Sequence, residues 1–313
     1  MQGLELSRRF FAEWGEPELE KRFPGLLQRA AVGLAGEGSE CFGYDDALSL
    51  DHDFEPGFCL WLTAEDYRAH GFALERWYAA RPRAFAGFDR QKLAPVGGSR
   101  HGAQEIGDFY RRFLGTPGAP ETWEQWLYLP QQSLACACSG AVFRDDTGMF
   151  SRVRETLRQG YPRDVRAKKL AAHSLLMYQA GVYNYPRCLA RDERGAAQLA
   201  VFEFARHAIS LVYLLNGVYE PFYKWVYRGM REFSLLSGLG ESLTALTELG
   251  NAPEEAAAKQ ETMEEICTLV ARCLFEQGWS ASPEPDLEKQ AYAVQKGIRD
   301  PEIRNLHIMD GAG

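Results

Sequence analysis

Two small residues and two acids within residues 31–63 are the groups whose types and spacing could do chemistry. Gly38 and Ser39 follow a short apolar run, and neither carries a bulky side chain. Their backbone N–H groups and the serine hydroxyl could therefore receive a phosphate at close range. Asp51 and Asp53 follow eleven residues later. Side chains at i and i+2 on extended backbone share a face, so this pair could hold a hard cation. A solvated acidic turn is the alternative interpretation of the pair.

Short apolar runs on both sides of these groups predict the strands that position them. Residues 31–35 read as a strand that leads into the Gly-Ser turn, and residues 58–62 read as the next strand, since that run is too short for a buried helix. Thr63 and Asp66 have the spacing of a capping box and predict a helix that runs to about residue 80. A further short strand is expected at 103–106.

The pattern Gly38-Ser39, then Asp51-x-Asp53, resembles the motif of the nucleotidyltransferase (polymerase-beta-like) superfamily. The wider segment GEGSECFGYDDALSLDHD is similar to the DUF4037 family of nucleotidyltransferase-like proteins. Further segments that resemble this family are Trp126-Leu127-x-x-Pro130, Gly140-x-Val142-Phe143-x-Asp145 and Leu215-Asn216-x-x-Tyr219-x-Pro221-x-x-Lys224-Trp225. The resemblance covers roughly residues 30–236. It departs from the superfamily at the polar His52 and at residues 54–57, which separate the acids from the next strand.

The resemblance implies a role for each residue of the motif. Gly38 and Ser39 would hold the triphosphate of an NTP, and Asp51 and Asp53 would be catalytic ligands of Mg²⁺ or Mn²⁺. Members of the superfamily generally supply a third carboxylate from a later strand, which activates the attacking hydroxyl or completes the metal site. Glu105 is the candidate for that role, and its alternative is a solvent-facing strand residue.

Three residues in the second half are candidates for contacts with the nucleotide. Lys224 carries a long ammonium side chain that could reach a triphosphate, or could instead lie over neighbouring aromatic surface. Asn216 near the end of an apolar helix would contact nucleotide or substrate, or would only cap the helix. Arg187 lies in a segment rich in tyrosine and arginine that could pair with phosphate, or could be solvated.

A cluster of Pro and Gly at residues 115–120 is the best candidate boundary between domains. We therefore expect a nucleotidyltransferase-like domain at 1–118 and a helical domain at 119–313 that binds substrate and closes over the nucleotide. Amphipathic periodicity predicts the helices of this second part, at about 152–160, 163–182, 190–216, 221–236, 239–249, 253–277 and 285–297. The predicted fold class is α+β, with a small mixed sheet followed by an all-helical bundle.

Composition excludes several classes of protein. The net charge of −8 argues against a general binder of DNA, RNA or anionic membranes, because such proteins usually carry an excess of basic residues. Seven cysteines without a CxxC pair read as reduced thiols rather than as a disulfide framework or a zinc site. No run approaches the ~20 apolar residues of a membrane span. We expect a cytoplasmic protein.

Together, the residues and the resemblance imply Mg²⁺-dependent transfer of a nucleoside monophosphate from an NTP, with ATP the expected donor. The acceptor would be a hydroxyl of an unknown small molecule or protein. An alternative is a catalytically inactive protein of the same fold that binds a nucleotide or metabolite in a regulatory role, which the departures at His52 and at residues 54–57 motivate. A purely structural interaction protein is a third hypothesis, and it predicts no nucleotide binding.

Overall fold

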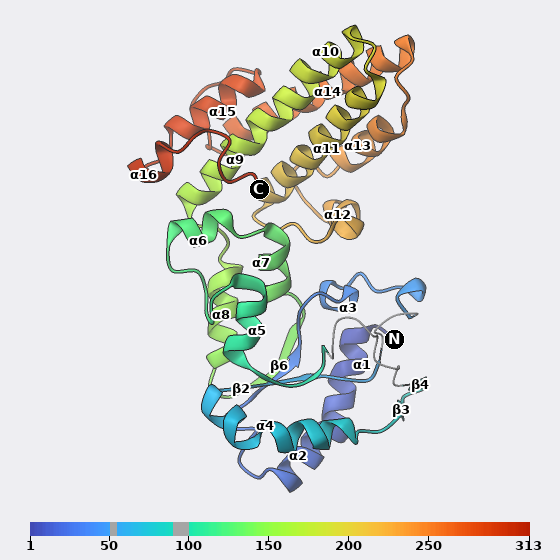
Figure 1. Ribbon diagram of the computed structural model, residues 1–313, viewed down its shortest axis with the longest axis vertical. Coiled ribbons are helices and arrows are strands. Elements are labelled where there is room, and N and C mark those ends of the chain that lie inside the picture. The colour runs from blue at the N-terminus through green and yellow to red at the C-terminus, as the bar shows by residue number, and fades with distance from the viewer. Residues whose placement is uncertain (51–54, 90–99) are drawn as a thin grey trace. The chain divides into compact units, whose positions relative to one another are not determined.

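The chain forms two compact units in the computed structural model, which describes residues 1–50, 55–89 and 100–313. The first unit comprises residues 1–120 and 132–159, and the second comprises residues 121–131 and 160–313. The first unit carries the β-sheet, whereas the described elements of the second unit are all helical (Figure 1). The predicted α+β class, with a small mixed sheet and a helical part, is confirmed.

The first unit is built on a four-stranded mixed sheet with the strand order β5-β2-β1-β6. Its strands are β1 (Ala31–Leu34), β2 (Cys59–Leu62), β5 (Gly102–Glu105) and β6 (Ala141–Asp145). β1 runs antiparallel to both of its neighbours, and β2 runs parallel to β5. A separate hairpin pairs β3 (Ala84–Phe85) with β4 (Phe88–Asp89). The first three strands of the sheet were predicted from the sequence, and β6 was not.

Helices supply the rest of the first unit. They are α1 (Gly3–Phe10), the π-helical turn η1 (Phe11–Gly15), α2 (Glu16–Arg22), α3 (Ser39–Phe42), the 3-10 turn η2 (Ala47–Leu50), α4 (Ala64–Ala79), α5 (Ile106–Leu114), α7 (Gln131–Cys138) and α8 (Met149–Arg158). The first residue of α7, Gln131, belongs to the second unit. Thr63 accepts a hydrogen bond from the backbone N–H of Asp66 at 3.1 Å, so the predicted helix start is confirmed.

Alternating side chains of β2 build a core on each face of the sheet. Phe58, just before the strand, and Leu60 belong to a buried cluster with residues of the N-terminal helices and of α4. Trp61 points to the other face, where its ring stacks on Phe150 of α8 with centroids 3.9 Å apart. Both faces of β2 are thus buried, as its unbroken apolar sequence predicts.

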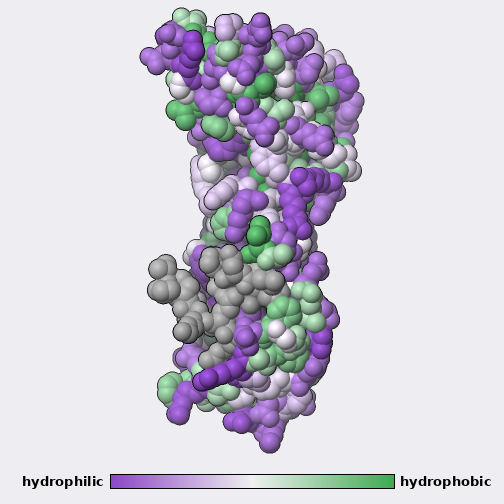
Figure 2. Space-filling view, turned by 90° about the vertical axis from the view of Figure 1, so that its right-hand side faces the viewer, coloured by the Kyte–Doolittle hydropathy of each residue, from purple (hydrophilic) through white to green (hydrophobic). Residues whose placement is uncertain are grey.

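The second unit is a set of helices around α9 and α11, which lie side by side (Figure 1). Its helices are α6 (Trp123–Tyr128), α9 (Arg163–Tyr178), the π-helical turn η3 (Gln179–Asn184), α10 (Tyr185–Ala190), α11 (Arg194–Asn216), α12 (Tyr223–Met230), α13 (Leu239–Glu248), α14 (Pro253–Glu276), α15 (Leu287–Lys296) and α16 (Pro301–Arg304). By length and composition α11 could cross a membrane, but 72% of its apolar window is buried inside the structure. Hydrophilic residues predominate on the visible face of this unit, in the upper part of Figure 2.

A pair of histidines is buried between α9 and α11. His173 Nδ1 lies 3.0 Å from His207 Nδ1, and Arg206 Nη2 lies 3.1 Å from His207 Nε2. Because an arginine can only donate, Nε2 of His207 accepts, and its proton resides on Nδ1, which donates to His173. Burial, with a smaller effect of the Arg206 charge, lowers the pKa of His207 to about 4, and burial also holds the pKa of His173 well below its usual value. Both rings are therefore neutral at neutral pH.

Two buried lysines of α9 hold the last residues of the chain against the second unit. Lys168 Nζ donates to the carbonyls of His307 and Ile308 at 2.7 and 2.8 Å, and Lys169 Nζ donates to the carbonyl of Gly311 at 2.9 Å. Burial lowers the pKa of each lysine to about 8. Carbonyl oxygens thus satisfy these ammonium groups, and they fix residues 307–311 to the helix.

The division of the chain differs from the expected single boundary between 118 and 119. The chain does leave the first unit after Pro120, but residues 132–159 return to it. They return because β6 pairs with β1 along the whole of that strand, from Ala31 opposite Asp145 to Leu34 opposite Ala141. The first domain therefore consists of two segments of the sequence.

Candidate functional site

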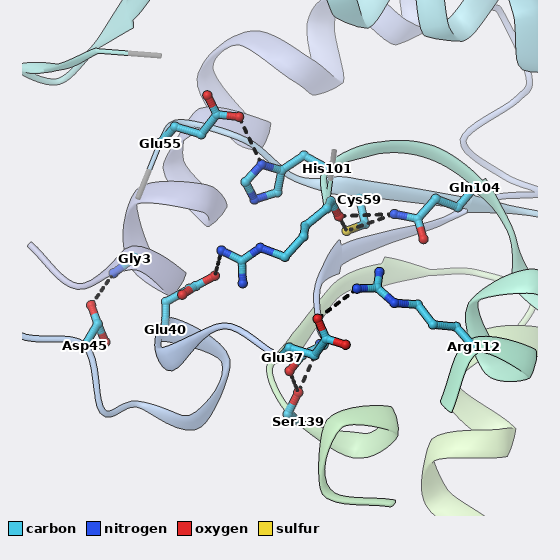
Figure 3. A network of polar contacts seen from close by, with 12 residues as sticks. Gly3, Glu37, Glu40, Asp45, Glu55, Cys59, His101, Gln104, Arg112 and Ser139 are labelled. Carbon is cyan, nitrogen blue, oxygen red and sulfur yellow. Dashed lines mark hydrogen bonds and ion pairs between the residues drawn. The ribbon is translucent and has the colours of Figure 1, made fainter. Parts of the chain in front are cut away.

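Four chain segments meet at one end of the sheet, which we call the loop end. The register places Gly33 of β1 opposite Cys59 of β2, and Cys59 beside Gly102 of β5. On the other side, Leu34 lies opposite Ala141 of β6. The residues that follow β1 and those that precede β2, β5 and β6 therefore converge there (Figure 3). The predicted phosphate cradle, Gly38 and Ser39, lies in the first of these segments.

Ser139 fixes the segment that leads from β1 into the Gly-Ser turn. Its hydroxyl accepts a hydrogen bond from the backbone N–H of Gly36 at 3.0 Å and donates to the carbonyl of the same residue at 2.7 Å. Figure 3 shows this contact below Glu37. A single side chain before β6 thus satisfies both backbone groups of Gly36, and the turn that follows begins from a fixed point.

A buried arginine supports Ser139 in turn. Arg154 of α8 is only 2% exposed, and its guanidinium donates to the carbonyls of Ser139 at 2.6 Å and of Gly140 at 3.1 Å. Gly140 has a φ of +68°, and a Cβ atom there would lie 2.0 Å from the carbonyl oxygen of Leu34. A side chain at this position would therefore push β1 and the start of β6 apart.

Among the described residues, three carboxylates at the loop end each face a cation. Glu37 lies 2.8 Å from Arg112 of α5, and Glu40 lies 3.6 Å from Arg100. The third, Glu55, faces Arg81 at 2.7 Å. Glu40 is nearly buried, with a side chain 9% exposed, whereas the Glu37 and Arg112 side chains are 39% and 43% exposed. Glu37 and Glu40 lie on either side of Gly38 in the sequence. The pair that contains Glu37 is more exposed to solvent than the pair that contains Glu40.

Glu55 forms a buried pair of contacts just before β2. Its Oε1 atom lies 2.7 Å from Arg81 Nη2 and 3.3 Å from His101 Nδ1. Burial by itself raises the pKa of Glu55, but the hydrogen bonds and charges of His101 and Arg81 outweigh burial and leave the pKa below its usual value. Glu55 is therefore ionised at neutral pH. Its contact with His101 joins the residues just before β2 to those just before β5.

The Gly-Ser turn itself has free backbone donors. In the part of the chain that the structure describes, the N–H groups of Gly38, Ser39 and Glu40 donate to no protein acceptor. The carboxylate of Glu40 folds back against Gly38, since a Cβ atom on that glycine would lie 2.0 Å from Oε1 of Glu40. This turn can therefore accept an anion through its backbone, next to a carboxylate of its own chain.

The predicted metal ligands Asp51 and Asp53 lie outside the described residues. Within residues 1–50, 55–89 and 100–313, no three His, Cys, Asp or Glu side chains are grouped so that they could hold a metal ion. The acids at the loop end are each engaged with arginine or histidine. A metal site there would therefore depend on Asp51 and Asp53.

The structure does not bring Glu105 to the loop end. Glu105 is the last residue of β5 and pairs with Leu62, at the end of β2 that is farther from Gly38. Three residues of strand separate it from Gly102, which corresponds to roughly 10 Å. Its Oε1 atom lies 3.9 Å from Arg111 Nη2. This position fits the alternative for Glu105, a strand residue outside the site, and its ion pair with Arg111 lies within the first unit.

The three candidates in the second unit make local contacts. Asn216 donates to the carbonyls of Val212 at 2.8 Å and Leu235 at 3.0 Å and accepts from the Leu235 N–H at 3.2 Å, so its amide ties the end of α11 to residue 235. The exposed Lys224 lies over the ring of Trp225 at 5.5 Å. The exposed Arg187 donates to the hydroxyl of Tyr183 at 2.8 Å. These contacts correspond to the structural alternatives for all three residues.

Sequence reasoning missed the residues that surround the Gly-Ser turn. Glu40 follows the motif directly, so its place in the site could have been inferred from adjacency alone. Ser139 and Arg154 had no such signal, because their partner loop lies more than 100 residues away from Ser139 in the sequence. Only the pairing of β6 with β1 brings them together.

Comparison with known proteins bears on the middle of the chain. Residues 126–226 match the family model described as a domain of unknown function, DUF4037, so the resemblance read from the sequence is confirmed for that part. The chain is also similar to a nucleotidyltransferase-like protein from Exiguobacterium sibiricum 255-15, with 10% identity over 84% of this chain and 79% of that chain and a TM-score of 0.38. These values are too low to establish a shared fold. No curated protein matches the sequence.

Proposed function

We propose that this protein is a nucleotidyltransferase that moves a nucleoside monophosphate from an NTP, ATP in the first instance, to a hydroxyl group. The observation that carries the proposal is the Gly38–Ser39 turn at the loop end, whose N–H groups donate to no acceptor among the described residues and whose preceding segment is fixed through Gly36 and Ser139. A preorganised set of backbone donors binds a phosphate without further ordering of the chain. The family match covers Ser139 but not the turn itself.

In the proposed reaction, the acceptor hydroxyl oxygen attacks the α-phosphorus of the NTP. The bond from the α-phosphorus to the bridging oxygen of the β-phosphate breaks, pyrophosphate leaves, and the hydroxyl proton passes to a base or to solvent. Gly38 and Ser39 would bind the phosphates, and Asp51 and Asp53 would hold Mg²⁺ or Mn²⁺, which would offset the charge of the triphosphate. We leave Glu105 out of this site because β5 carries it to the other end of the sheet.

The acceptor is proposed to be a small molecule or a protein, and a cytoplasmic location is part of the proposal. The net charge of −8 supports an acceptor other than DNA or RNA and gives no support for a membrane partner. All seven cysteines are free thiols, which fits a reducing compartment. Lys224 and Arg187 keep exposed cationic side chains, so their contact with nucleotide stays a prediction.

Calorimetric titration with each NTP tests the proposal. We expect the wild-type protein to bind an NTP in the presence of Mg²⁺ and the Asp51→Ala/Asp53→Ala variant to lose at least tenfold in affinity, because two negative charges that recruit the metal are removed. Glu105→Gln is the matched acid control and is expected to bind and turn over as the wild type does. Pyrophosphate release in a screen of acceptors then measures transfer.

Two results would contradict the proposal in different ways. A folded wild-type protein that binds no NTP with Mg²⁺ or Mn²⁺ is incompatible with a nucleotide site at the Gly-Ser turn. Binding without pyrophosphate release for any acceptor would favour the second candidate, a nucleotide- or metabolite-binding regulatory protein. The close approach of the Glu40 carboxylate to Gly38 is the observation that keeps this second candidate in view.

A further inference from the structure

The carboxylate of Glu40 occupies the space directly over the backbone of Gly38. A Cβ atom on Gly38 would lie 2.0 Å from Oε1, 2.4 Å from Cδ and 2.4 Å from Oε2 of Glu40. The whole carboxylate therefore rests where any side chain at position 38 would stand. The Glu40 side chain is 9% exposed, so this carboxylate is held inside the turn rather than extended into solvent.

Arg100 faces this carboxylate, and hydrogen bonds hold the backbone of Arg100 in place. Its Nη2 atom lies 3.6 Å from Oε1 of Glu40. Its backbone carbonyl accepts hydrogen bonds from Cys59 Sγ at 3.1 Å and from Gln104 Nε2 at 3.1 Å. Burial raises the pKa of the Cys59 thiol to about 12, so the thiol keeps its proton and remains a donor. The backbone of Arg100 is therefore anchored at the position from which its guanidinium faces Glu40.

We propose that Glu40 is an internal anion that occupies the phosphate position over Gly38, and that Arg100 passes from Glu40 to a phosphate of the substrate when the two anions exchange. The inference rests on the proposed function for the identity of the incoming anion. Carboxylate and phosphate oxygens both accept from guanidinium, so one arginine serves either anion. They repel each other and cannot share the space against a single glycine, so binding requires that Glu40 swings away.

The neighbouring pair of Glu37 and Arg112 provides a matched control. Glu37 lies on the same loop as Glu40, and its distance to Arg112 of α5 is shorter, 2.8 Å, but both side chains are about two-fifths exposed. Solvent screens such a pair, and its carboxylate is not the group that lies against Gly38. Glu37→Gln and Glu40→Gln therefore each remove one negative charge from the same loop, and only the charge of Glu40 lies against Gly38.

The test is calorimetric titration of the full-length protein with inorganic tripolyphosphate and, separately, with ATP and Mg²⁺ at about 0.15 M salt. Glu40→Gln is expected to tighten the Kd for both probes by on the order of tenfold, because a nearly buried competing charge is removed. Arg100→Gln is expected to weaken both by a similar factor, and Glu37→Gln is expected to change them by less than about twofold. Thermal unfolding checks that each variant is folded.

A second variant keeps the test decisive if Glu40→Gln fails to fold. Glu40→Asp retains the charge but withdraws the carboxylate by one methylene, and it is expected to give an intermediate gain in affinity. Affinity in Glu40→Gln that equals or falls below that of the wild type would overturn the inference and leave the proposed function standing. Failure of the wild type and of Glu40→Gln alike to bind either probe would overturn the proposed function, and the inference with it.

Discussion

Arg154 is a charged residue buried for structural reasons. Among the described residues, its guanidinium donates to two backbone carbonyls rather than to a carboxylate, and burial lowers the pKa of its guanidinium from the usual value. The carbonyls belong to Ser139 and Gly140, which together hold the loop between β1 and α3 in place. Arg154 therefore supports the candidate site indirectly. It holds Ser139, and Ser139 in turn holds Gly36 before the Gly-Ser turn.

Replacing this arginine should destabilise the first unit. Arg154→Met keeps much of the side-chain volume but leaves two buried carbonyls without donors, and we expect a loss of about 3 kcal/mol in the free energy of unfolding. Urea denaturation measures the loss. The control is Arg152→Met, at an exposed position on the same helix, which should change stability by less than about 0.5 kcal/mol. Equal effects of the two substitutions would show that the contacts to Ser139 and Gly140 contribute little.

At the scale of single residues, the sequence predicts the Gly-Ser turn but not the residues Ser139 and Arg154 that hold it in place. Gly38 and Ser39 could be predicted because their chemistry follows from residue type and from their place after an apolar run. Asp51 and Asp53 were predicted on the same basis and lie outside the described residues. Glu105 was assigned from its place in a short strand, but the parallel pairing of that strand decides which end of the sheet it reaches. Local sequence does not show whether a strand pairs in a parallel or an antiparallel direction. It therefore could not show which end of the sheet Glu105 reaches.

The contact between α9 and α11 depends on two neutral histidines. An unfolded histidine takes up a proton near pH 6.5, whereas His207 in the folded protein does so only near pH 4. Between these values the unfolded chain binds more protons than the folded protein, so stability falls as the pH falls through this window. Above about pH 7.5 neither state binds the proton to a significant extent, and the contribution of His207 is constant.

We expect the wild-type protein to lose about 2 kcal/mol of stability through His207 between about pH 7.5 and pH 5, with a slope that approaches 1.36 kcal/mol per pH unit below pH 6.5. The measurement is urea denaturation across that range. His207→Gln should lower the stability at pH 7 but flatten the dependence on pH. An equally steep slope in His207→Gln would assign the acid sensitivity to other groups.

The positions of helices and strands were predicted better than the pairing between strands. The apolar runs of β1 and β2 and the cap of α4 are local signals, and all three elements lie where these signals place them. β6 was missed because it is five residues long and lies between helices, and its partly exposed residues give no continuous apolar run. Its partner strand is more than 100 residues away, so no pattern near it indicates a sheet.

At the scale of the whole molecule, the sheet depends on two separated stretches of sequence. A fragment that ends at residue 118, the boundary predicted from the Pro/Gly cluster, would lack β6 and α8. It would leave β1 with one neighbour, and Trp61 would lose its stacking partner Phe150. The end of the first domain at about residue 120 is thus visible in the sequence, but the return of residues 132–159 is not.

We therefore expect residues 1–118 to fail to fold as an isolated fragment and residues 1–159 to fold. Exposure of the apolar face of the sheet and of a strand edge should make the shorter fragment unfolded or aggregated. Far-UV circular dichroism and size-exclusion chromatography of the two fragments measure the difference. A cooperatively folded monomer of residues 1–118 would contradict the role assigned to β6.

The pairing of β6 with β1 also sets the timing of biosynthesis. β1 is made early, but its second neighbour follows about 110 residues later along the chain. Ribosomes add about 5–20 residues per second, so one edge of β1 waits for roughly 6–20 s before the sheet can close. During this time the nascent chain presents an open strand edge, which favours aggregation. Chaperone demand during translation should therefore be greatest before residue 145 has left the ribosome.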